Sequence, residues 1–503
     1  MSSPDPIRSI LIVGGGLAGC MAALYLQRFL RFDQCLITLV ESANVETIGV
    51  GEATSPRLVG FLRNLRLDET AFMRACHATY RLGTRFVDWR GPGHEYWQPF
   101  GVGGGWIDGV ELFHPWLRAH RLGSAPAAYA DYSLQAQAAQ ALKAPRPLTG
   151  SSPMMDAGGY AFHLDAAALA AHLRELSIGA GLIHLFDEVA TVERDAAGDL
   201  ACIRTQAGRE LSADLYLDCT GARGLLIEGA LGDRWIDWSD LLPCDRAVVT
   251  PLPRDPAAPP YTSIDAAAAG WRWRFPLSHR AGAGQVYSSR HLDDDGAAAH
   301  LLATLSPPER LGAVPRFLRT RVGRRSACWS HNCVAIGPAA GSCEPLEATG
   351  IDLIQLAIEA LMEHFPDRRF DPVLRRDYNA ALSLVHDEVR DLTLLHYLLG
   401  ERDDTPFWRD ARAVPVPTSL TEAMERHDAT GAVRTSGAFP STSYHFICAG
   451  NGRLPRRPSP QVNRIDPTEA ASIMARILSQ NQALIATLPT HRALLQSIHE
   501  PAW

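Results

Sequence analysis

The segment from Ser9 to Glu41 constrains the fold of this chain more than any other. An apolar strand pattern at 9–13 precedes the glycine turn Gly14-Gly15-Gly16-Leu17-Ala18-Gly19, a helix is expected at 18–31, and a second apolar strand follows at 36–40. Such glycines allow a tight turn and close approach of the backbone to a pyrophosphate, and the helix N-terminus offers N–H groups to phosphates. Glu41 ends the second strand, where an acid bonds ribose hydroxyls. The pattern predicts a nucleotide-binding βαβ unit with contacts from Gly14, Gly16, Leu17, Ala18, Gly19 and Glu41.

Two later segments have the pattern of strands in the same layer. Residues 215–221 and 332–337 are apolar runs that end in small-residue turns. Either is also compatible with an ordinary buried strand, but their order and spacing resemble the FAD-binding fold of flavin monooxygenases, which favours FAD over NAD. The glycines at 101–105 and 282–284 lack a flanking strand and helix, so no second dinucleotide unit is predicted. We therefore expect reduced FAD to come from a separate reductase.

Composition excludes several classes of protein. The 503 residues carry 48 basic and 55 acidic side chains, a net charge of −7, without a Lys/Arg-rich run, so nucleic acid is not an expected partner. No run of about 18 apolar residues is present, and a short polar segment precedes the first strand, so we expect a soluble cytoplasmic protein that does not enter the membrane. The ten cysteines form no CxxC pair, and neither a metal site nor a disulfide framework is expected.

The expected fold class is α/β: a doubly wound FAD-binding fold, Rossmann-like and of the flavin monooxygenase type, with an additional β-sheet and a mostly helical C-terminal cap. Residues 1–365 are assigned to the FAD-binding part with an interleaved substrate-side sheet. Residues 366–503 are assigned to a mostly helical region that covers the substrate, the two parts forming one interwoven unit. Within it, 406–467 is rich in Pro, Ser and Thr and is expected to form long loops, and a final helix is expected near 467–488.

Further motifs follow the glycine turn along the chain. They are Gly49-Val50-Gly51-Glu52-Ala53-Thr54, Tyr160-Ala161-Phe162-His163-Leu164-Asp165, Asp218-Cys219-Thr220-Gly221-Ala222-Arg223-Gly224, Gly270-Trp271-Arg272-Trp273-Arg274-Phe275-Pro276, Glu344-Pro345-Leu346-Glu347-Ala348-Thr349-Gly350 and Arg402-Asp403-Asp404-Thr405-Pro406-Phe407-Trp408. Together with the glycine turn, these motifs resemble those of the tryptophan halogenase family and lie in that family's order, from about residue 8 to residue 450. The resemblance implies that FADH2 and oxygen form a flavin hydroperoxide, which a halide, chloride or bromide, attacks. The hypohalous acid formed then travels through a tunnel to a separate aromatic substrate of the indole or phenol type.

The resemblance also implies roles for particular residues. Trp271 and Trp273 would line the passage between flavin and substrate, although two aromatic residues at period two also suit a strand packed in the core. Glu347 would orient hypohalous acid or accept the proton that the halogenated ring loses, although an acid before a helix is also stabilised by the helix dipole. Thr349 and Gly350 would bind the halide. They precede a helix that is predicted by an apolar stripe at helical spacing, which comprises Ile351, Ile354, Ile358, Leu361 and Phe365. The remaining contacts to FAD would come from Gly51, Glu52, Ala53, Thr54, Gly337 and Ile351.

Arg81 is the main departure from the family. Family members carry an essential lysine at this place, and the next basic residue, Arg85, is also an arginine. Lysine can lose its proton and form a haloamine, whereas a guanidinium stays protonated and is a poor nucleophile. Arg81 is therefore expected to hold the oxidant by hydrogen bonds in lysine's place, although it also suits a solvated charge on a strand.

The substrate is less well specified. Gln98 replaces a histidine found in some relatives, and Phe100, Phe439 and Tyr444 are further candidates for the pocket. A small molecule and a carrier-bound or peptide-bound aromatic are both compatible with the sequence, and a homodimer is left open. Two other functions also stay open: a flavin monooxygenase that inserts oxygen directly, and a flavin-binding relative without halogenation activity because the lysine is replaced.

Overall fold

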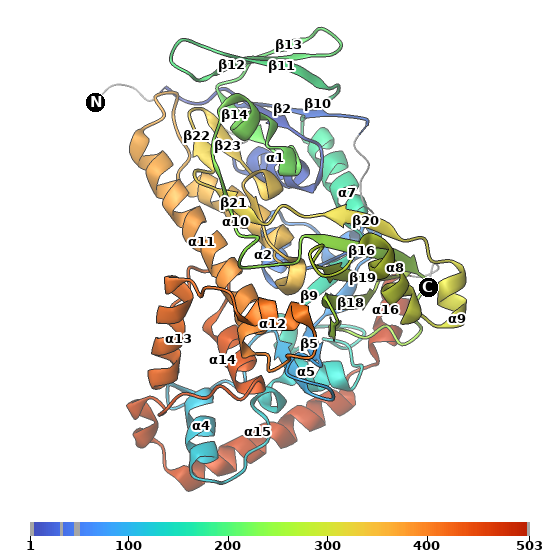
Figure 1. Ribbon diagram of the computed structural model, residues 1–503, viewed down its shortest axis with the longest axis vertical. Helices are drawn as coiled ribbons and strands as arrows, with labels where there is room; N and C mark the ends of the chain where they lie inside the picture. The colour runs from blue at the N-terminus through green and yellow to red at the C-terminus, as the bar shows by residue number, and fades with distance from the viewer. Residues whose placement is uncertain (1–4, 31–33, 45–50, 500–503) are drawn as a thin grey trace.

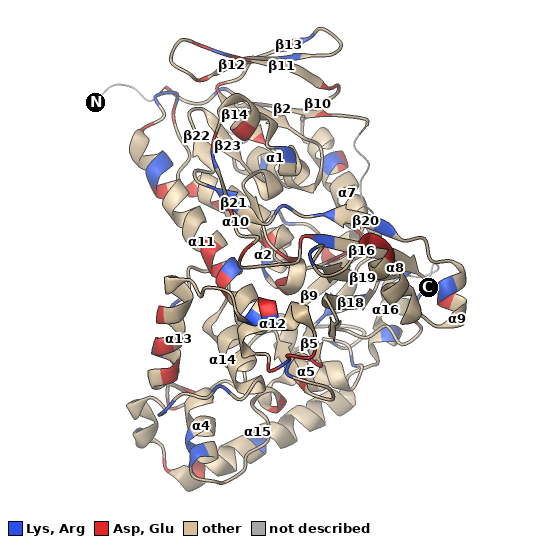
Figure 2. Cartoon of the chain, in the orientation of Figure 1, with Lys and Arg blue, Asp and Glu red and all other residues tan. Residues whose placement is uncertain are grey.

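The computed structural model describes residues 5–30, 34–44 and 51–499, and the molecule is elongated in the view of Figure 1. A parallel sheet with helix α1 lies at one end, helices α4, α13, α14 and α15 lie at the other, and a large mixed sheet lies between them. Acidic and basic residues are interspersed along the elements (Figure 2).

The parallel sheet has the strand order of a doubly wound nucleotide-binding fold. Its strands, from one edge to the other, are β10 (Ile183–Phe186), β2 (Leu36–Glu41), β1 (Ser9–Val13), β14 (Leu215–Asp218), β23 (Cys333–Ala335) and β22 (Trp329–Ser330). All neighbours are parallel except β22 and β23. Numbered among themselves along the chain, the five parallel strands stand third, second, first, fourth and fifth from the β10 edge, so the order reverses beside β1, where such folds bind their nucleotide. The predicted strands at 215–221 and 332–337 therefore do belong to this layer.

Helix α1 (Leu17–Phe29) follows the glycine turn and is buried along most of its length. It packs on α7 (Ala166–Gly179) and α10 (Gly350–Glu363), which lie far from it in sequence. Its expected end at residue 31 lies outside the described residues. Small side chains such as Ala18, Ala22 and Ala23 let these neighbours approach closely, which places the N-termini of α1 and α10 in the same part of the fold.

A mixed sheet of seven strands forms the additional sheet that the sequence predicts. Its order is β20 (Arg316–Arg319), β16 (Arg246–Leu252), β19 (Ala281–Tyr287), β18 (Gly270–Pro276), β17 (Thr262–Ala267), β5 (Gly83–Val87) and β6 (Glu95–Pro99). Thr262 on β17 pairs with Thr84 on β5, which pairs with Gln98 on β6. Three polar side chains from distant parts of the sequence are thus aligned across adjacent strands.

Smaller sheets complete the β structure. They consist of β3 (Glu52–Ala53), β9 (Ala161–Leu164) and β4 (Thr79–Arg81); β11 (Val189–Arg194), β12 (Leu200–Thr205) and β13 (Glu210–Leu211); β15 (Trp235–Asp237), β21 (Gly323–Arg325) and β24 (Gly341–Ser342); and the hairpin β7 (Trp106–Ile107) and β8 (Val110–Glu111). The short connection from β4 to β5 joins one of these sheets to the large sheet, and Arg81 is the last residue of β4.

Helices surround the sheets. Besides those already given, they are α2 (Arg57–Asn64), α3 (Glu69–Ala75), α4 (Phe113–Arg121), α5 (Leu134–Gln140), α6 (Pro153–Asp156), α8 (Asp294–Ala303), α9 (Pro307–Leu311), α11 (Pro372–Leu399), α12 (Pro406–Arg412), α13 (Thr418–Thr430), α14 (Ser441–Gly450), α15 (Pro467–Thr487) and α16 (His491–His499). Within the described ranges, no helix is both long and apolar enough to cross a membrane.

The expectation of long loops at 406–467 is wrong, because α12, α13 and α14 lie in this segment. Its Pro, Ser and Thr residues mark helix starts instead of interrupting helices. The Thr405 side chain accepts a hydrogen bond from the N–H of Trp408, and Pro406 is the first residue of α12. Pro417 and Pro440 immediately precede α13 and α14. Proline suits a helix start because the N–H that it lacks has no partner there.

The C-terminal helices contact elements from the first part of the chain. Helix α15 packs on α4 and α5, α16 packs on α3, and α14 packs on strand β6. Because β6 carries Gln98, the helical region covers the edge of the large sheet where predicted pocket residues lie. The division at residues 365 and 366 stays a prediction.

Candidate active site

The glycine turn leaves room for a phosphate. A Cβ atom at Gly14 would lie 2.3 Å from the Cys219 carbonyl oxygen, and one at Gly19 would lie 2.0 Å from that of Gly14, so both positions need the close approach that only glycine permits. A Cβ at Gly16 would meet nothing within 4 Å. The space in front of Gly16, at the start of α1, therefore fits the pyrophosphate of FAD.

Glu41 lies at the end of β2, as predicted, beside the glycine turn. Nη1 of Arg174 lies 3.0 Å from each of its carboxylate oxygens, and Nε2 of His184 lies 2.8 Å from Oε2. A Cβ at Gly15 would lie 2.3 Å from the Glu41 side chain. The carboxylate is thus held in position where the ribose of a bound dinucleotide is expected.

The turn before α10 faces two cavities. Ala348 has a φ of 55°, a left-handed conformation uncommon for a residue with a side chain. Ala348 lines one cavity and Glu347 lines another. Thr349 and Gly350 begin α10, and a Cβ at Gly350 would meet nothing within 4 Å, so the helix N-terminus is open to a small anion.

The same helix start lies near the glycine turn. Gly337 has a φ of 69°, and a Cβ there would lie 3.0 Å from the Cβ of Ala18 on α1. Ile351 is buried in the first turn of α10. The first contact brings two of the predicted flavin-binding positions, Gly337 and Ala18, together, and a Cβ at Gly337 would also lie 3.2 Å from Ile354 on α10. Gly49 and Val50 of the predicted motif lie outside the described residues.

The first cavity has a volume of about 110 Å³. Its lining includes Gly51, Glu52, Ala53, Arg81, Trp271, Trp273, Phe275 and Ala348. Cavities that take drug-sized ligands measure roughly 300–1,000 Å³, so this space suits a halide or hypohalous acid and not an aromatic substrate. We refer to it as the small cavity.

Trp271 and Trp273 both line the small cavity. Trp271 is buried, and its Nε1 donates to Oε2 of Glu344 at 3.5 Å. Trp273 stacks on Phe275 with the ring centroids 4.7 Å apart, and its ring covers Gly284 of the adjacent strand β19. The alternation along β18 thus brings the two indoles to one wall, as the period of two predicts.

Arg81 is buried and held on several sides. Nε donates to Oγ1 of Thr262 (2.9 Å), Nη1 to the carbonyl oxygen of Thr54 (2.5 Å) and Nη2 to Oγ1 of Thr84 (2.6 Å). Burial lowers its pKa to about 10, and the charges of Glu347 and Asp352 oppose that shift, so the guanidinium is a cation at neutral pH. A guanidinium has five N–H groups, and these bonds leave two for a ligand. Arg81 is therefore not a solvated strand charge.

A buried histidine fixes the threonine behind Arg81. Oγ1 of Thr262, which accepts from Arg81, lies 2.9 Å from Nε2 of His163. Nδ1 of His163 lies 3.4 Å from Oγ1 of Thr79, which donates to a backbone carbonyl. Burial holds the pKa of His163 well below its usual range, and the charge of Arg81 acts in the same direction. The neutral imidazole therefore accepts the Thr262 proton and orients the oxygen that Arg81 contacts.

The second cavity is large enough for an aromatic substrate. It measures about 640 Å³, and its lining includes Ser55, Arg57, Gln98, Phe100, Glu347, Asp352, Gln355, Glu359, Phe439 and Thr442. We refer to it as the large cavity. Gln98, Phe100 and Phe439 all lie on its wall, as the sequence predicts. Tyr444 does not: it is buried in the core and donates to Glu388 (3.2 Å).

Glu347 is held from two sides at the wall of the large cavity. Nε2 of Gln98 donates to Oε2 at 3.0 Å, and Nε2 of His396 bonds to Oε1. Nδ1 of His396 in turn lies 2.7 Å from the hydroxyl of Tyr96. With both oxygens bonded, the carboxylate has a fixed orientation, which a group that accepts a substrate proton needs.

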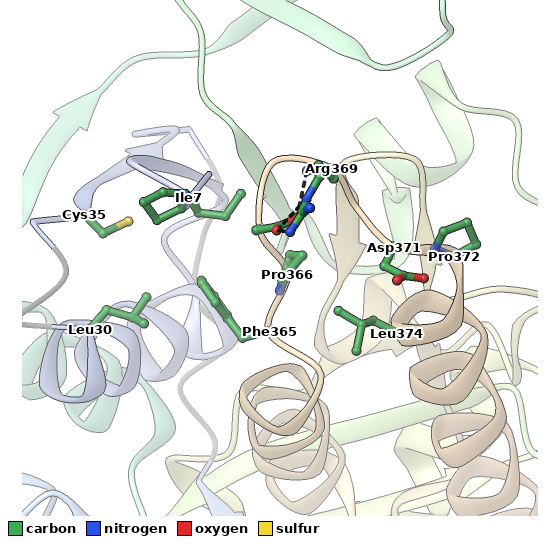
Figure 3. Close-up of a pocket in the computed structure, with 11 residues that line it drawn as sticks. Ile7, Leu30, Cys35, Phe365, Pro366, Arg369, Asp371, Pro372 and Leu374 are labelled. Atoms are coloured by element: carbon green, nitrogen blue, oxygen red, sulfur yellow. Dashed lines mark hydrogen bonds and ion pairs between the residues drawn. The ribbon is translucent and has the colours of Figure 1, made fainter. Parts of the chain in front are cut away.

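A third cavity, of about 740 Å³, lies elsewhere, between the start of the chain, the end of α1 and the segment before α11 (Figure 3). Its wall includes Ile7, Leu30, Phe365 and Leu374, and Arg369 pairs there with Asp367. It contains none of the predicted site residues. Among the described residues, no group of three His, Cys, Asp or Glu side chains could hold a metal ion.

Some residues of the site were not predicted from the sequence. His396 lies within the long helix α11, and Asp352, Gln355 and Glu359 lie on α10 beside the apolar stripe that identified that helix. The last three residues are spaced at i, i+3 and i+7, which places them on one face of a helix. This spacing is the sequence signal from which a polar face of α10 could have been predicted. Nothing in the sequence around His396 places it next to Glu347.

The comparisons with known proteins agree with this arrangement. The family model "Tryptophan halogenase" matches residues 9–467, and the chain belongs to that family. It is 37% identical to a tryptophan 6-halogenase from Streptomyces toxytricini, with 97% of this chain and 98% of the relative covered. The predicted membership is thereby confirmed.

Solved structures show the same fold. A flavin-dependent halogenase from Brevundimonas sp. BAL3 matches with a TM-score of 0.90 and 39% identity over 98% of this chain and 99% of that one. A flavin-dependent halogenase from Xanthomonas campestris matches with a TM-score of 0.91 and 38% identity over 98% of each chain. The expected α/β fold with a helical C-terminal region is confirmed.

Proposed function

We propose that this protein is a flavin-dependent halogenase that makes hypohalous acid at the small cavity and halogenates an electron-rich aromatic substrate in the large cavity. The observation that carries the proposal is the position of Arg81. It lines the small cavity, and its guanidinium carbon lies 4.9 Å from the ring centroid of Phe100, which lines the large one. Family membership supports the reaction, and the cavity sizes support separate places for oxidant and substrate.

FAD fits the described residues, with its pyrophosphate at Gly16 and the start of α1, and its ribose near Glu41. In its reduced form and with oxygen, it supplies the oxidising equivalent that converts a halide to hypohalous acid. The open N-terminus of α10 at Thr349 and Gly350 holds the halide through backbone N–H groups. Trp271 and Trp273 form the wall of the small cavity and keep bulky substrates away from the flavin.

Arg81 takes the place of the family lysine as a fixed hydrogen-bond donor. Its remaining N–H groups hold hypohalous acid and polarise the bond between oxygen and halogen, which makes the halogen more electrophilic. No haloamine forms, because the guanidinium stays protonated. The threonines at 54, 84 and 262 keep the donor in position.

Glu347 then accepts the proton that the substrate ring loses when the carbon–halogen bond forms. The atoms balance: the ring carbon gains the halogen, and its proton passes through Glu347 to the hydroxide that hypohalous acid leaves, so the products are the halogenated ring and water. Gln98 and His396 keep the carboxylate oriented toward the ring. A separate reductase supplies reduced FAD, and either chloride or bromide serves as the halide.

The test supplies purified protein with FAD, a generic flavin reductase, NADH, oxygen and either bromide or chloride, together with a soluble trap for electrophilic halogen. We expect halogenated trap above the level of reductase-only controls, and only when a halide is present. Hydrogen peroxide alone, with or without halide, would contradict halogenation. An oxygenated aromatic product that needs no halide would identify a monooxygenase instead.

A further inference from the structure

The polar wall of the large cavity lies along one face of α10. Asp352, Gln355 and Glu359 recur at i, i+3 and i+7, which places them in one row along the helix. At about 1.5 Å per residue, the row extends roughly 10 Å from the end near Glu347. A substrate whose ring lies beside Glu347 and Phe100 would therefore have its substituents along this row.

The charges on this wall are mainly negative. Glu347, Asp352 and Glu359 line the cavity, and Arg57 is the only Lys or Arg among the described lining residues. The chain itself engages Arg57 in part: Nη2 donates to the Gly437 carbonyl oxygen (2.5 Å), Nη1 lies 3.9 Å from Oε2 of Glu359, and Nε has no partner among the described residues. A carboxylate on a substrate would find three like charges and one cation that Glu359 already partly neutralises.

Arg81 does not provide a second anion site here. It lies within electrostatic range of Asp352 and Glu347, but it lines the small cavity, and Thr54, Thr84 and Thr262 enclose its guanidinium. Phe100, which lines the large cavity, covers one face of that guanidinium. A substrate carboxylate in the large cavity is therefore kept from that face.

Two glutamines supply an independent observation. The side-chain carbonyl oxygens of Gln355 (2% exposed) and Gln98 (7% exposed) have no hydrogen-bond partner among the described residues. Their amide orientation is fixed, because Nε2 of Gln355 donates to Glu359 (2.7 Å) and that of Gln98 donates to Glu347, and carboxylates only accept. Buried acceptors without partners are costly, and donors on a ligand would satisfy them.

Asp352 is the group best placed to hold a cation. Ser55 donates to its Oδ1 at 2.8 Å, and the residue is 5% exposed. Burial raises its pKa to about 6, so its ionised form lacks full solvation. A bound cation would stabilise that ionised form, whereas a bound anion would oppose it.

We propose that the substrate of the large cavity is an electron-rich aromatic ring that carries a protonated amine and no carboxylate. The ring lies between Phe100 and Glu347, and the ammonium group lies between Asp352 and Glu359, with Gln355 accepting a further hydrogen bond. This inference rests on the proposed function of the large cavity as the substrate site.

The test measures binding by isothermal titration calorimetry to the FAD-loaded protein, without reductase, NADH or halide. Two matched pairs are compared: tryptamine with indole-3-propionate, and tyramine with 3-(4-hydroxyphenyl)propionate. In at least one pair the amine is expected to bind about tenfold or more tighter than the acid of the same ring and chain. Asp352→Asn and Glu359→Gln are each expected to reduce that preference, whereas Glu422→Gln on the exposed face of α13 leaves it unchanged.

Equal or tighter binding of the acids, no measurable binding of either amine, or a preference that survives in the double variant Asp352→Asn/Glu359→Gln would overturn the inference. The measurement does not depend on catalysis, so it separates the two proposals. If the trap is halogenated but the amines bind no tighter than the acids, only this inference is overturned. If the amines bind tighter but no trap is halogenated, only the proposed reaction is overturned.

Discussion

The guanidinium of Arg81 stacks over Phe100, with its carbon 4.9 Å from the ring centroid. The cation thus contacts the small cavity on one side and the aromatic wall of the large cavity on the other. Such a cation–π contact contributes roughly 0.5–2 kcal/mol, the larger value when the groups are desolvated; here Arg81 is buried and Phe100 is partly buried. Arg81 is therefore fixed at the boundary between the place where the oxidant forms and the place where the substrate is bound.

The phosphate cradle gives the first prediction. Gly16→Ala should fold like the wild type, because its Cβ meets nothing within 4 Å, but it should weaken FAD binding because the methyl group occupies the space for the pyrophosphate. Gly19→Ala should instead lower the melting temperature of the FAD-free protein, since its Cβ would lie 2.0 Å from a carbonyl oxygen. Thermal unfolding and quenching of FAD fluorescence measure the two effects. Equal FAD affinity in Gly16→Ala and the wild type would refute the cradle.

The wall of the small cavity gives the second prediction. A Cβ in Gly284→Ala would lie 2.7 Å from the indole of Trp273, so the ring must move. We expect aromatic halogenation to slow by about 10-fold to 100-fold, since misplacement near a reacting centre costs on that order. Substrate affinity, measured by calorimetry, should not change, because Trp273 does not line the large cavity.

Gly179→Ala at the end of α7 is the control with the same substitution, because its Cβ would meet nothing within 4 Å. It should match the wild type in both measurements. A Gly284→Ala variant with the wild-type rate would show that the position of Trp273 is unimportant.

Glu347 gives the third prediction. Glu347→Gln removes the proton acceptor but leaves the small cavity unchanged. Halogenation of the aromatic substrate should fall by about 10²–10⁴-fold, while halogenated trap formed in solution stays at the wild-type level. The two products are quantified in parallel by mass spectrometry. A parallel loss of both would place Glu347 in halide oxidation instead, and Glu422→Gln serves as the charge-matched control.

Asp352 gives the fourth prediction. Burial raises its pKa to about 6, so between pH 4 and pH 6 the folded protein binds a proton that the unfolded chain releases. The contribution of Asp352 to stability therefore declines as the pH rises through this range. The melting temperature of Asp352→Asn should rise relative to the wild type from pH 4 to pH 7. A constant difference would mean that the folded state does not perturb this carboxyl group.

The nucleotide-binding part could be predicted well from the sequence because its signals are local. The strands at 9–13 and 36–41, the glycine turn and the apolar stripe of α10 each follow from the spacing of neighbouring residues. The error at 406–467 came from treating proline as a helix breaker, whereas Pro406, Pro417 and Pro440 stand at helix starts. A proline before or at the start of a segment with helical apolar periodicity marks the start of a helix, whereas a proline inside such a segment breaks the helix.

The site could be predicted only where a family motif marked it. Arg81, Glu347 and the two tryptophans were identified this way, but no motif predicted the bonds that hold them. Thr84, Thr262 and Gln98 align only through strand pairing, and His396 reaches Glu347 across 49 positions of the chain. Contacts of this kind depend on tertiary packing and leave no periodic signal. Tyr444 shows the opposite error. It was predicted to line the substrate pocket, but its side chain is buried in the core.

The most direct test of the proposed role of Arg81 compares Arg81→Met and Arg81→Lys with the wild type in halide-dependent halogenation of an aromatic substrate that binds the large cavity. Because Arg81 is proposed to act as a fixed donor, Arg81→Met should lower the rate by about 10²–10³-fold, with FAD affinity unchanged. Arg81→Lys, which keeps a cationic donor, should remain active. A wild-type rate in Arg81→Met, or no halide-dependent product from the wild type, would contradict the central role of Arg81.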